Sequence, residues 1–222
     1  KVKVDWIRLL YLHPAHLNDE IINSILALDK VIPYLDIPIQ HVSSKMLKMM
    51  NRKHDRQQLE ALIAKLKNEM DGLALRTTIM VGFPGEKDTD FEELYNFIER
   101  VEFDWLGAFT FNPEEGTAAA DLPYQLDETV KRDRLDTILK LQQEITRKKN
   151  IARIGKTEEI LVSGQLSSNL YIGRAYFQAP EVDGLTLIKS NRKLPRGEFT
   201  RVRFAGVRNY DMIGEVIDEP AQ

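Results

Sequence analysis

Three polar side chains lie in or beside apolar runs that are typical of buried strands. Gln40 and His41 follow residues 34–39, and Arg76 lies inside a second predicted strand, directly before its apolar run at residues 77–81. An unpaired charge in a buried strand is costly, so the Arg76 guanidinium needs a carboxylate partner. A ligand carboxylate would provide one, although a structural ion pair is the favoured interpretation. The acidic candidates for that pair are Glu69, Asp71 and Asp36.

The second run, residues 77–81, ends in a glycine turn, GFPG, at residues 82–85. The glycines are free to adopt a positive φ, and the proline ends the strand ladder. Ligands of parallel α/β sheets collect where strands end, so the amides of this turn could receive a nucleoside or a carboxylate. The alternative is a plain tight connection, because GFPG alone is not specific for a site.

Residues 75–100 predict a strand, this turn and a helix in succession. Side chains alternate along a strand, so Arg76, Thr78 and Met80 should share one face. Thr89 stands three residues before Glu92, which is the spacing of a capping box, and apolar residues then recur at helical period. The opposite face of the strand should carry Thr77, Ile79 and Val81.

The first 126 residues alternate between strand and helix patterns. Strands are expected at residues 6–12, 34–39, 77–81 and 105–111, and helices at residues 18–28, 44–50, 56–69 and 89–98. Asn18 and either Ser43 or Ser44 are the expected N-caps of the first two helices. This alternation predicts parallel strands with right-handed crossovers, and hence a barrel or an open sheet. Four strands are few for a closed barrel.

A long helix and a small β domain should follow. Residues 127–153 predict a spacer helix, and its inward face should carry Val130, Leu135, Ile138, Leu141 and Ile145. From residue 154 the pattern changes to five short alternating strands, which favours a small OB-like barrel. The expected domains are therefore residues 1–126, 127–153 and 154–222.

The composition limits the chemistry further. The chain has 222 residues and no cysteine, which excludes disulfides, thiolate metal sites and a cysteine nucleophile within it. The four histidines, His13, His16, His41 and His54, do not have the spacing of a metal-ligand set. No apolar run approaches the roughly 20 residues of a membrane span, and no signal peptide is present. The expected location is the cytoplasm.

Five ordered motifs resemble the radical S-adenosylmethionine (SAM) methylthiotransferases over nearly the whole chain. They are YLDIPIQH, LRTTIMVGFPGE, FNPEEGTAAADLP, LQQEI and GRAYFQAPEVDG. The resemblance implies a partial TIM-like barrel followed by a TRAM domain. Gln40-His41 and the APEVDG motif at residues 179–184 resemble the branch that modifies a ribosomal protein.

The resemblance implies the addition of a methylthio group to the β-carbon of an aspartate in a small-subunit ribosomal protein. Family members use SAM and two 4Fe–4S clusters. The cysteine loop and the three-cysteine amino-terminal domain that hold the clusters are absent here. The chain is therefore expected to be the carboxy-terminal part of such an enzyme, ligating no cluster and inactive alone. A tRNA adenosine methylthiotransferase and a non-catalytic RNA- or ribosome-binding module are the alternatives.

Several residues acquire expected roles through this resemblance. Gln40 would hydrogen-bond SAM, or else cap its loop, and Arg76 would bind a ligand carboxylate if it has no structural partner. The expected adenine-supporting residues are Thr78, Met80, Gly82 and Phe111, with Phe109 beside Phe111, although an aromatic pair at this spacing is commonly plain core.

The expected substrate contacts lie at one strand end and in the second domain. His41 would line the substrate opening or be a solvated loop residue. Between residues 189 and 208 there are seven basic residues and one acidic residue. Arg201 and Arg203 alternate with apolar residues and, with Arg192, should form a basic face for RNA or a ribosomal protein. A solvated strand face is the alternative for each.

Overall fold

The computed structural model describes residues 3–217. The chain divides into two compact units, Lys1–Gln142 and Gln143–Gln222, and the division falls within helix α5 (Glu128–Ile151). The first unit contains a four-stranded sheet and the second contains a closed five-stranded barrel. No helix of the described part of the chain is long and apolar enough to cross a membrane.

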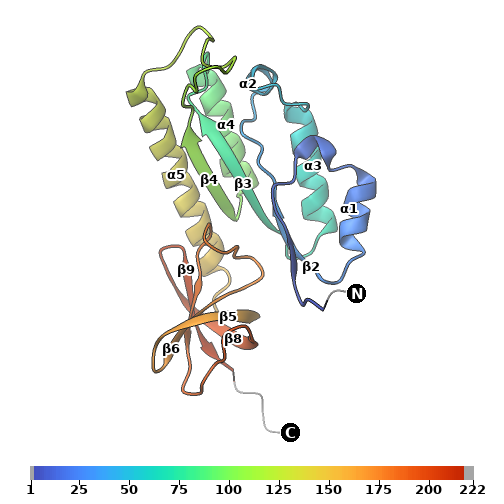
Figure 1. Cartoon of the computed structure of the whole chain (residues 1–222), viewed down its shortest axis with the longest axis vertical. Helices are drawn as coiled ribbons and strands as arrows, with labels where there is room; N and C mark the ends of the chain where they lie inside the picture. Colours follow the sequence, from blue (N-terminus) through green and yellow to red (C-terminus); the bar gives the residue numbers. More distant parts are fainter. Residues whose placement is uncertain (1–2, 218–222) are drawn as a thin grey trace. The chain divides into compact units, whose positions relative to one another are not determined.

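The sheet of the first unit has the strand order β1-β2-β3-β4, and all three neighbouring pairs are parallel. The strands are β1 (Ile7–Leu9), β2 (Val31–Asp36), β3 (Ala74–Val81) and β4 (Trp105–Thr110). In Figure 1, α1 and α3 lie on the β2 side of this sheet, and α5 lies beside β4. The predicted parallel strands are confirmed.

Helices connect the strands where the apolar periodicity predicts them. They are α1 (Asp19–Leu26), α2 (Ser44–Met49), α3 (Arg56–Glu69) and α4 (Asp88–Val101), and a short 3₁₀ helix that was not predicted, η1 (Pro14–His16), precedes α1. The predicted cap of α1 is confirmed, because Asn18 Oδ1 accepts the Ile21 N–H at 3.0 Å. Ser43 occupies the N-cap position of α2 but makes no capping bond there.

The predicted capping box at Thr89 and Glu92 is wrong. Helix α4 begins one residue before Thr89, and Lys87 is its N-cap residue. The Lys87 N–H donates to Asp90 Oδ2 at 3.0 Å. Asp90 is the acidic residue three positions after this cap, and its carboxylate also pairs with Lys45. The tertiary ion pair therefore favours the earlier start.

Strand β3 alternates as predicted. Thr77, Ile79 and Val81 are buried, whereas Arg76, Thr78 and Met80 are partly exposed on the opposite face. The buried Thr77 hydroxyl donates to the Ile37 carbonyl at 2.9 Å, which satisfies its polar atom inside the sheet.

The predicted inward face of α5 is partly wrong. Val130 is exposed, and Leu135 is only partly buried. The buried positions are Lys131, Arg134, Ile138, Leu141, Gln142, Ile145, Thr146 and Asn150. Long cationic side chains can bury their aliphatic stems when the charged group finds a partner. Two cations therefore replace the expected apolar residues at the start of the helix.

The barrel of the second unit is closed in the order β5-β6-β7-β9-β8. Its strands are β5 (Thr157–Ser167), β6 (Leu170–Arg174), β7 (Thr186–Lys189), β8 (Phe199–Arg208) and β9 (Asp211–Val216). On β8, Val202 and Phe204 are buried while Arg201 and Arg203 are exposed. The five predicted strands and the alternation along β8 are confirmed.

Candidate functional site

A cavity of about 760 Å³ lies at the carboxyl ends of β2, β3 and β4. Its lining comes from these strand ends, from α2 with the three residues that follow it, and from the loop after β4. The lining residues are Gln40, Met49, Met50, Asn51, Arg52, Met80, Phe83, Phe109, Thr110, Phe111, Asn112, Glu114, Thr117, Ala118, Ala119 and Leu122. The cavity thus lies at the edge where parallel sheets bind ligands.

Gln40 is held at this cavity by its backbone. Its N–H donates to the Thr78 carbonyl at 2.9 Å, and its carbonyl accepts the Met80 N–H at 2.8 Å. Its φ is 66°, a conformation that costs energy in a residue other than glycine. The side-chain Oε1 is buried and accepts no hydrogen bond from any residue between 3 and 217. It is therefore an acceptor ready for a donor from a ligand.

The rest of the cavity floor is apolar. Phe83 and Phe111 pack edge to face, with ring centroids 5.1 Å apart, in a cluster with Met46. Met80 packs on this cluster. Phe109 lines the cavity beside them and is 41% exposed. Aromatic and thioether groups next to the buried acceptor of Gln40 suit a flat, polar-edged group such as a nucleobase.

Arg52 also lines the cavity and was missed in the sequence. It is partly buried, and no carboxylate of the described residues forms an ion pair with it. Burial lowers the pKa of Arg52. A half-buried guanidinium favours a carboxylate partner from a ligand. Arg52 is far from the strand ends in the sequence, so no pattern predicted that it would lie at the cavity.

Three of the predicted ligand residues do not line the cavity. Arg76 Nη1 lies 3.1 Å from Asp36 Oδ1 and 3.3 Å from Thr78 Oγ1, so the predicted structural ion pair with Asp36 is confirmed. Gly82 is covered by α5: a Cβ built on it would lie 2.4 Å from Lys131 Cγ. Gln40, Met80 and Phe111, together with Phe109, are the predicted residues that the structure brings together at the cavity.

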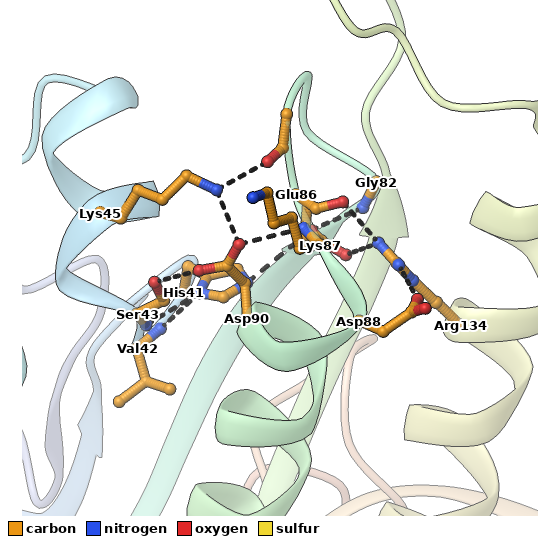
Figure 2. A network of polar contacts seen from close by, with 11 residues as sticks. His41, Val42, Ser43, Lys45, Gly82, Glu86, Lys87, Asp88, Asp90 and Arg134 are labelled. Carbon is orange, nitrogen blue, oxygen red and sulfur yellow. Dashed lines mark hydrogen bonds and ion pairs between the residues drawn. The ribbon is translucent and has the colours of Figure 1, made fainter.

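A buried polar network borders the cavity on the side of the glycine turn (Figure 2). Glu86 Oε2 accepts the Gly82 N–H at 2.8 Å, and Glu86 Oε1 lies 2.6 Å from Arg134 Nη1. Arg134 Nη2 also donates to Asp88 Oδ1 at 2.6 Å. Burial raises the pKa of the Glu86 carboxyl, and the Arg134 guanidinium opposes that rise. The network fixes the turn after β3.

His41 belongs to the same network and corrects an expectation. The side chain is fully buried, so the alternative of a solvated loop residue is wrong, and His41 is not among the residues that line the cavity. Nδ1 accepts the N–H groups of Val42 and Ser43 at 2.9 and 3.0 Å, which places the ring proton on Nε2. Nε2 lies 3.7 Å from Glu86 Oε2. Burial lowers the pKa of His41 to about 4, so the ring is neutral at pH 7.

Asp90 ties α2 to α4 beside His41. Its carboxylate accepts hydrogen bonds from the Ser43 hydroxyl and the Lys45 ammonium, at 2.7 and 2.8 Å. Burial acts to raise the pKa of Asp90, but the bonds from Lys45, the Lys87 amide and Ser43 outweigh it and the pKa is lowered. This carboxylate therefore stays ionised and structural.

Three histidines lie close together in the structure, although their spacing in the sequence did not predict this. The His13 ring lies 4.9 Å from that of His16 and 5.7 Å from that of His54, between centroids. Within the described residues, no three His, Asp or Glu side chains are grouped so that they could hold a metal ion. The pKa of His54 is lowered to about 4, and burial makes the largest contribution to this shift.

The predicted basic residues of the second unit lie on the barrel. Arg201 and Arg203 are exposed on β8, and Arg192 lines a cavity of about 490 Å³ at the carboxyl ends of β7 and β9. The other residues of that cavity are Asn169, Lys189, Ser190, Asn191, Glu215 and Val216. The barrel thus carries exposed cations on β8 and directly after β7.

Comparison with known proteins agrees with both units. Residues 2–98 match the Radical SAM superfamily, and residues 154–217 match the TRAM domain. The structure of coproporphyrinogen III oxidase from Escherichia coli, a radical SAM enzyme, superposes on 63% of this chain and 32% of its own with a TM-score of 0.53 at 14% identity. The two family models therefore identify a radical SAM region followed by a TRAM domain, and the superposition agrees with the fold of the first unit.

Sequence relatives define the family. The chain is 58% identical over 96% of its length to the ribosomal protein uS12 methylthiotransferase RimO of Syntrophomonas wolfei, and 46% identical over 96% to that of Caldicellulosiruptor saccharolyticus. The chain belongs to the radical SAM methylthiotransferase family. It covers 48% of each of these relatives, so it spans about half their length.

Proposed function

We propose that this chain is the carboxy-terminal part of a radical SAM methylthiotransferase that acts on an aspartate of ribosomal protein uS12. The identity to two RimO proteins supports the substrate. The observation that carries the cofactor assignment is the unpartnered Gln40 Oε1 at an apolar cavity on the carboxyl edge of the sheet. An acceptor beside aromatic rings fits a nucleoside with hydroxyl or amino donors.

In this proposal, different cavity residues bind different parts of the SAM molecule. Gln40 accepts a hydrogen bond from a ribose hydroxyl or from the ammonium group. Met80, Phe83 and Phe111 pack against the adenine, and Arg52 receives the methionine carboxylate. Together they hold the cofactor still and exclude water, which protects a radical from quenching. When bound and cleaved by a one-electron reductant, SAM would supply the 5′-deoxyadenosyl radical that removes hydrogen from the substrate.

Arg76, Thr78 and Gly82 are proposed to support this pocket. Arg76 is engaged by Asp36, and the Thr78 carbonyl fixes the Gln40 N–H. Gly82 shapes the turn that carries Phe83. These three residues therefore shape the pocket from the sheet side, and any contact of theirs with SAM is secondary.

The residues present do not fit an iron–sulfur cluster. Family clusters are held by cysteine thiolates, and the chain contains no cysteine. We therefore assign the two 4Fe–4S clusters to cysteines outside these residues and derive no step through them. The chain alone is proposed to be inactive.

The barrel is proposed to dock the substrate in the cytoplasm. Arg192, Arg201 and Arg203 provide exposed positive charge that suits ribosomal RNA or an RNA-bound protein loop. His41 is not part of that surface, because its ring is buried. The same exposed cations favour the alternatives of a tRNA substrate or a non-catalytic RNA- or ribosome-binding module.

The finer architecture is part of the proposal. We propose that the four parallel strands belong to a TIM-like barrel and that the closed five-stranded barrel is OB-like. The superposition on a radical SAM enzyme supports the first, and the closure of the second unit supports the second. The proposed division is residues 1–126, a spacer helix at 127–153, and the TRAM domain at 154–222.

The test is methylthiolation by the intact parent enzyme, supplied with uS12 or with tRNA and read by mass spectrometry. The proposal expects the methylthio group on uS12, and at least a tenfold lower rate for Gln40→Ala, since one charge-assisted or buried hydrogen bond is worth roughly that factor. Thiomethylated tRNA with unmodified uS12 would establish the alternative substrate. Modification of neither, by an enzyme with intact clusters, would favour the binding module.

A further inference from the structure

Two turns that border the cavity meet through buried side chains. One turn follows β2 and holds Gln40 and His41, and the other follows β3 and holds Gly82 and Glu86. The His41 and Glu86 side chains are both fully buried, with Nε2 and Oε2 3.7 Å apart. Figure 2 shows Glu86 between His41 and Arg134. A shift of the Glu86 side chain would therefore change the contacts of both turns.

Glu86 depends on α5 for its position. Its Oε1 is 2.6 Å from Arg134 Nη1, and the same nitrogen donates to the Glu86 carbonyl at 3.3 Å. A buried carboxylate without a cation would tend to take up a proton or leave the interior. With Arg134 in place, Oε2 stays an acceptor for the Gly82 N–H, which lies 2.8 Å away.

We propose that Arg134 is a positioning residue that acts through Glu86 to hold the His41 turn and the Gly82 turn, and thereby the cavity between them. The consequence for ligand affinity rests on the proposed function, but the effect on the turns does not. Lys131 assists from the preceding turn of α5, because its stem packs over Gly82 and its ammonium lies 5.7 Å from the Phe111 ring centroid.

Amide hydrogen exchange by NMR tests the positioning directly in the 222-residue chain. In Arg134→Gln, exchange of the Gly82 amide should rise roughly tenfold or more, the factor that follows from loss of a buried charge-assisted bond. Exchange at Val42 and Ser43 should rise as well, while amides of β8 keep their wild-type rates. Arg134→Lys should restore part of the protection, because it keeps the charge near Glu86. The matched control is Arg132→Gln, an exposed arginine on the same helix.

An unchanged Gly82 rate in Arg134→Gln would overturn the proposal, as would an equal effect of Arg132→Gln. A uniform rise at every amide would reveal a general loss of stability and would overturn it too. If Arg134→Gln does not fold, Arg134→Lys and Glu86→Gln provide the same comparison of local against distant amides.

Binding of S-adenosylhomocysteine separates this inference from the proposed function. The wild-type chain should bind it, and Arg134→Gln should bind roughly tenfold more weakly at unchanged β8 exchange. If the wild type does not bind, the proposed pocket is wrong while the exchange result still decides the positioning role. If Arg134→Gln binds as tightly as the wild type, Arg134 does not position the cavity.

Discussion

Gly82 meets two separate constraints, a positive φ of 74° and a close approach of α5. A Cβ at this position would need to displace Lys131 Cγ, which lies 2.4 Å from it. Gly116 has a similar φ of 79°, but a Cβ there would meet nothing within 4 Å. The pair of glycines therefore separates backbone strain from packing.

Gly82→Ala should lower the free energy of unfolding by about 2–4 kcal/mol, because strain and overpacking add. Gly116→Ala should cost only about 1 kcal/mol, from the backbone alone. Denaturant unfolding of both variants measures the difference. Equal losses would mean that Lys131 does not press on the turn.

His41 should make stability depend on pH. Its pKa is lowered to about 4 in the folded protein, whereas an unfolded histidine titrates near 6.5. The unfolded state thus binds the proton first, and the stability present above pH 6.5 is lost as pH falls toward 4. The loss should be roughly 3 kcal/mol between those limits.

The matched variant is His41→Asn, whose amide oxygen can still accept the Val42 and Ser43 N–H groups but does not titrate. Unfolding curves from pH 7 to pH 4 should show a smaller loss of stability in this variant. Glu86 has a raised pKa and contributes with the opposite sign, but it is common to both proteins. Parallel pH profiles would rule out the His41 contribution.

At the scale of elements, periodicity and capping residues predicted the strands and most helices. Helix α3 matches its predicted range, and β3 alternates as expected. The long-range pairings could not be predicted from the sequence. Arg76 had three candidate acidic partners, and only the parallel register of β2 and β3 placed Asp36 opposite it. Gln40 at a strand end was predictable in the same way, whereas Arg52 reached the cavity through the turn after α2.

The predicted orientation of α5 was partly wrong for a physical reason. Hydropathy assigns lysine and arginine to solvent, but Lys131 and Arg134 lie on the buried face with Ile138, Leu141 and Ile145. These five positions recur at helical period, which was an available signal. The sequence could not reveal the partner of Arg134, because Glu86 is distant from it along the chain.

A neighbouring pair on this helix checks its orientation. Ile138 is fully buried, whereas Leu139 is 38% exposed. Ile138→Ala should lower the free energy of unfolding by about 2–4 kcal/mol through a cavity, and Leu139→Ala by less than about 1 kcal/mol. Chemical denaturation gives both values. A larger loss for Leu139→Ala would require a different face of α5 to be buried.

At the scale of the whole molecule, the notable local excess of positive charge is at residues 189–208 of the barrel, which hold seven basic residues and one acidic residue. Reversing Arg201 and Arg203 to glutamate should weaken binding to RNA or uS12 at low salt, and the difference should shrink as salt rises. Reversing Arg132 and Lys140, which are exposed on α5, makes the same change in net charge. Fluorescence anisotropy at several salt concentrations compares the two. Equal losses would assign the effect to net charge and not to the barrel face.

The nucleoside pocket at the carboxyl edge of the sheet is the central claim, and methionine methyl groups report on it. The chain has six methionines, and Met49, Met50 and Met80 line the cavity. Met70 and Met212 are buried core residues that do not line it. The methyl NMR spectrum, recorded during a titration with S-adenosylhomocysteine, therefore contains both probes and controls.

The account predicts saturable shifts of the Met49, Met50 and Met80 methyl resonances, with Met70 and Met212 unmoved, and loss of those shifts in Gln40→Ala. Shifts confined to Met212, or none at Met80 while the ligand binds elsewhere, would contradict it.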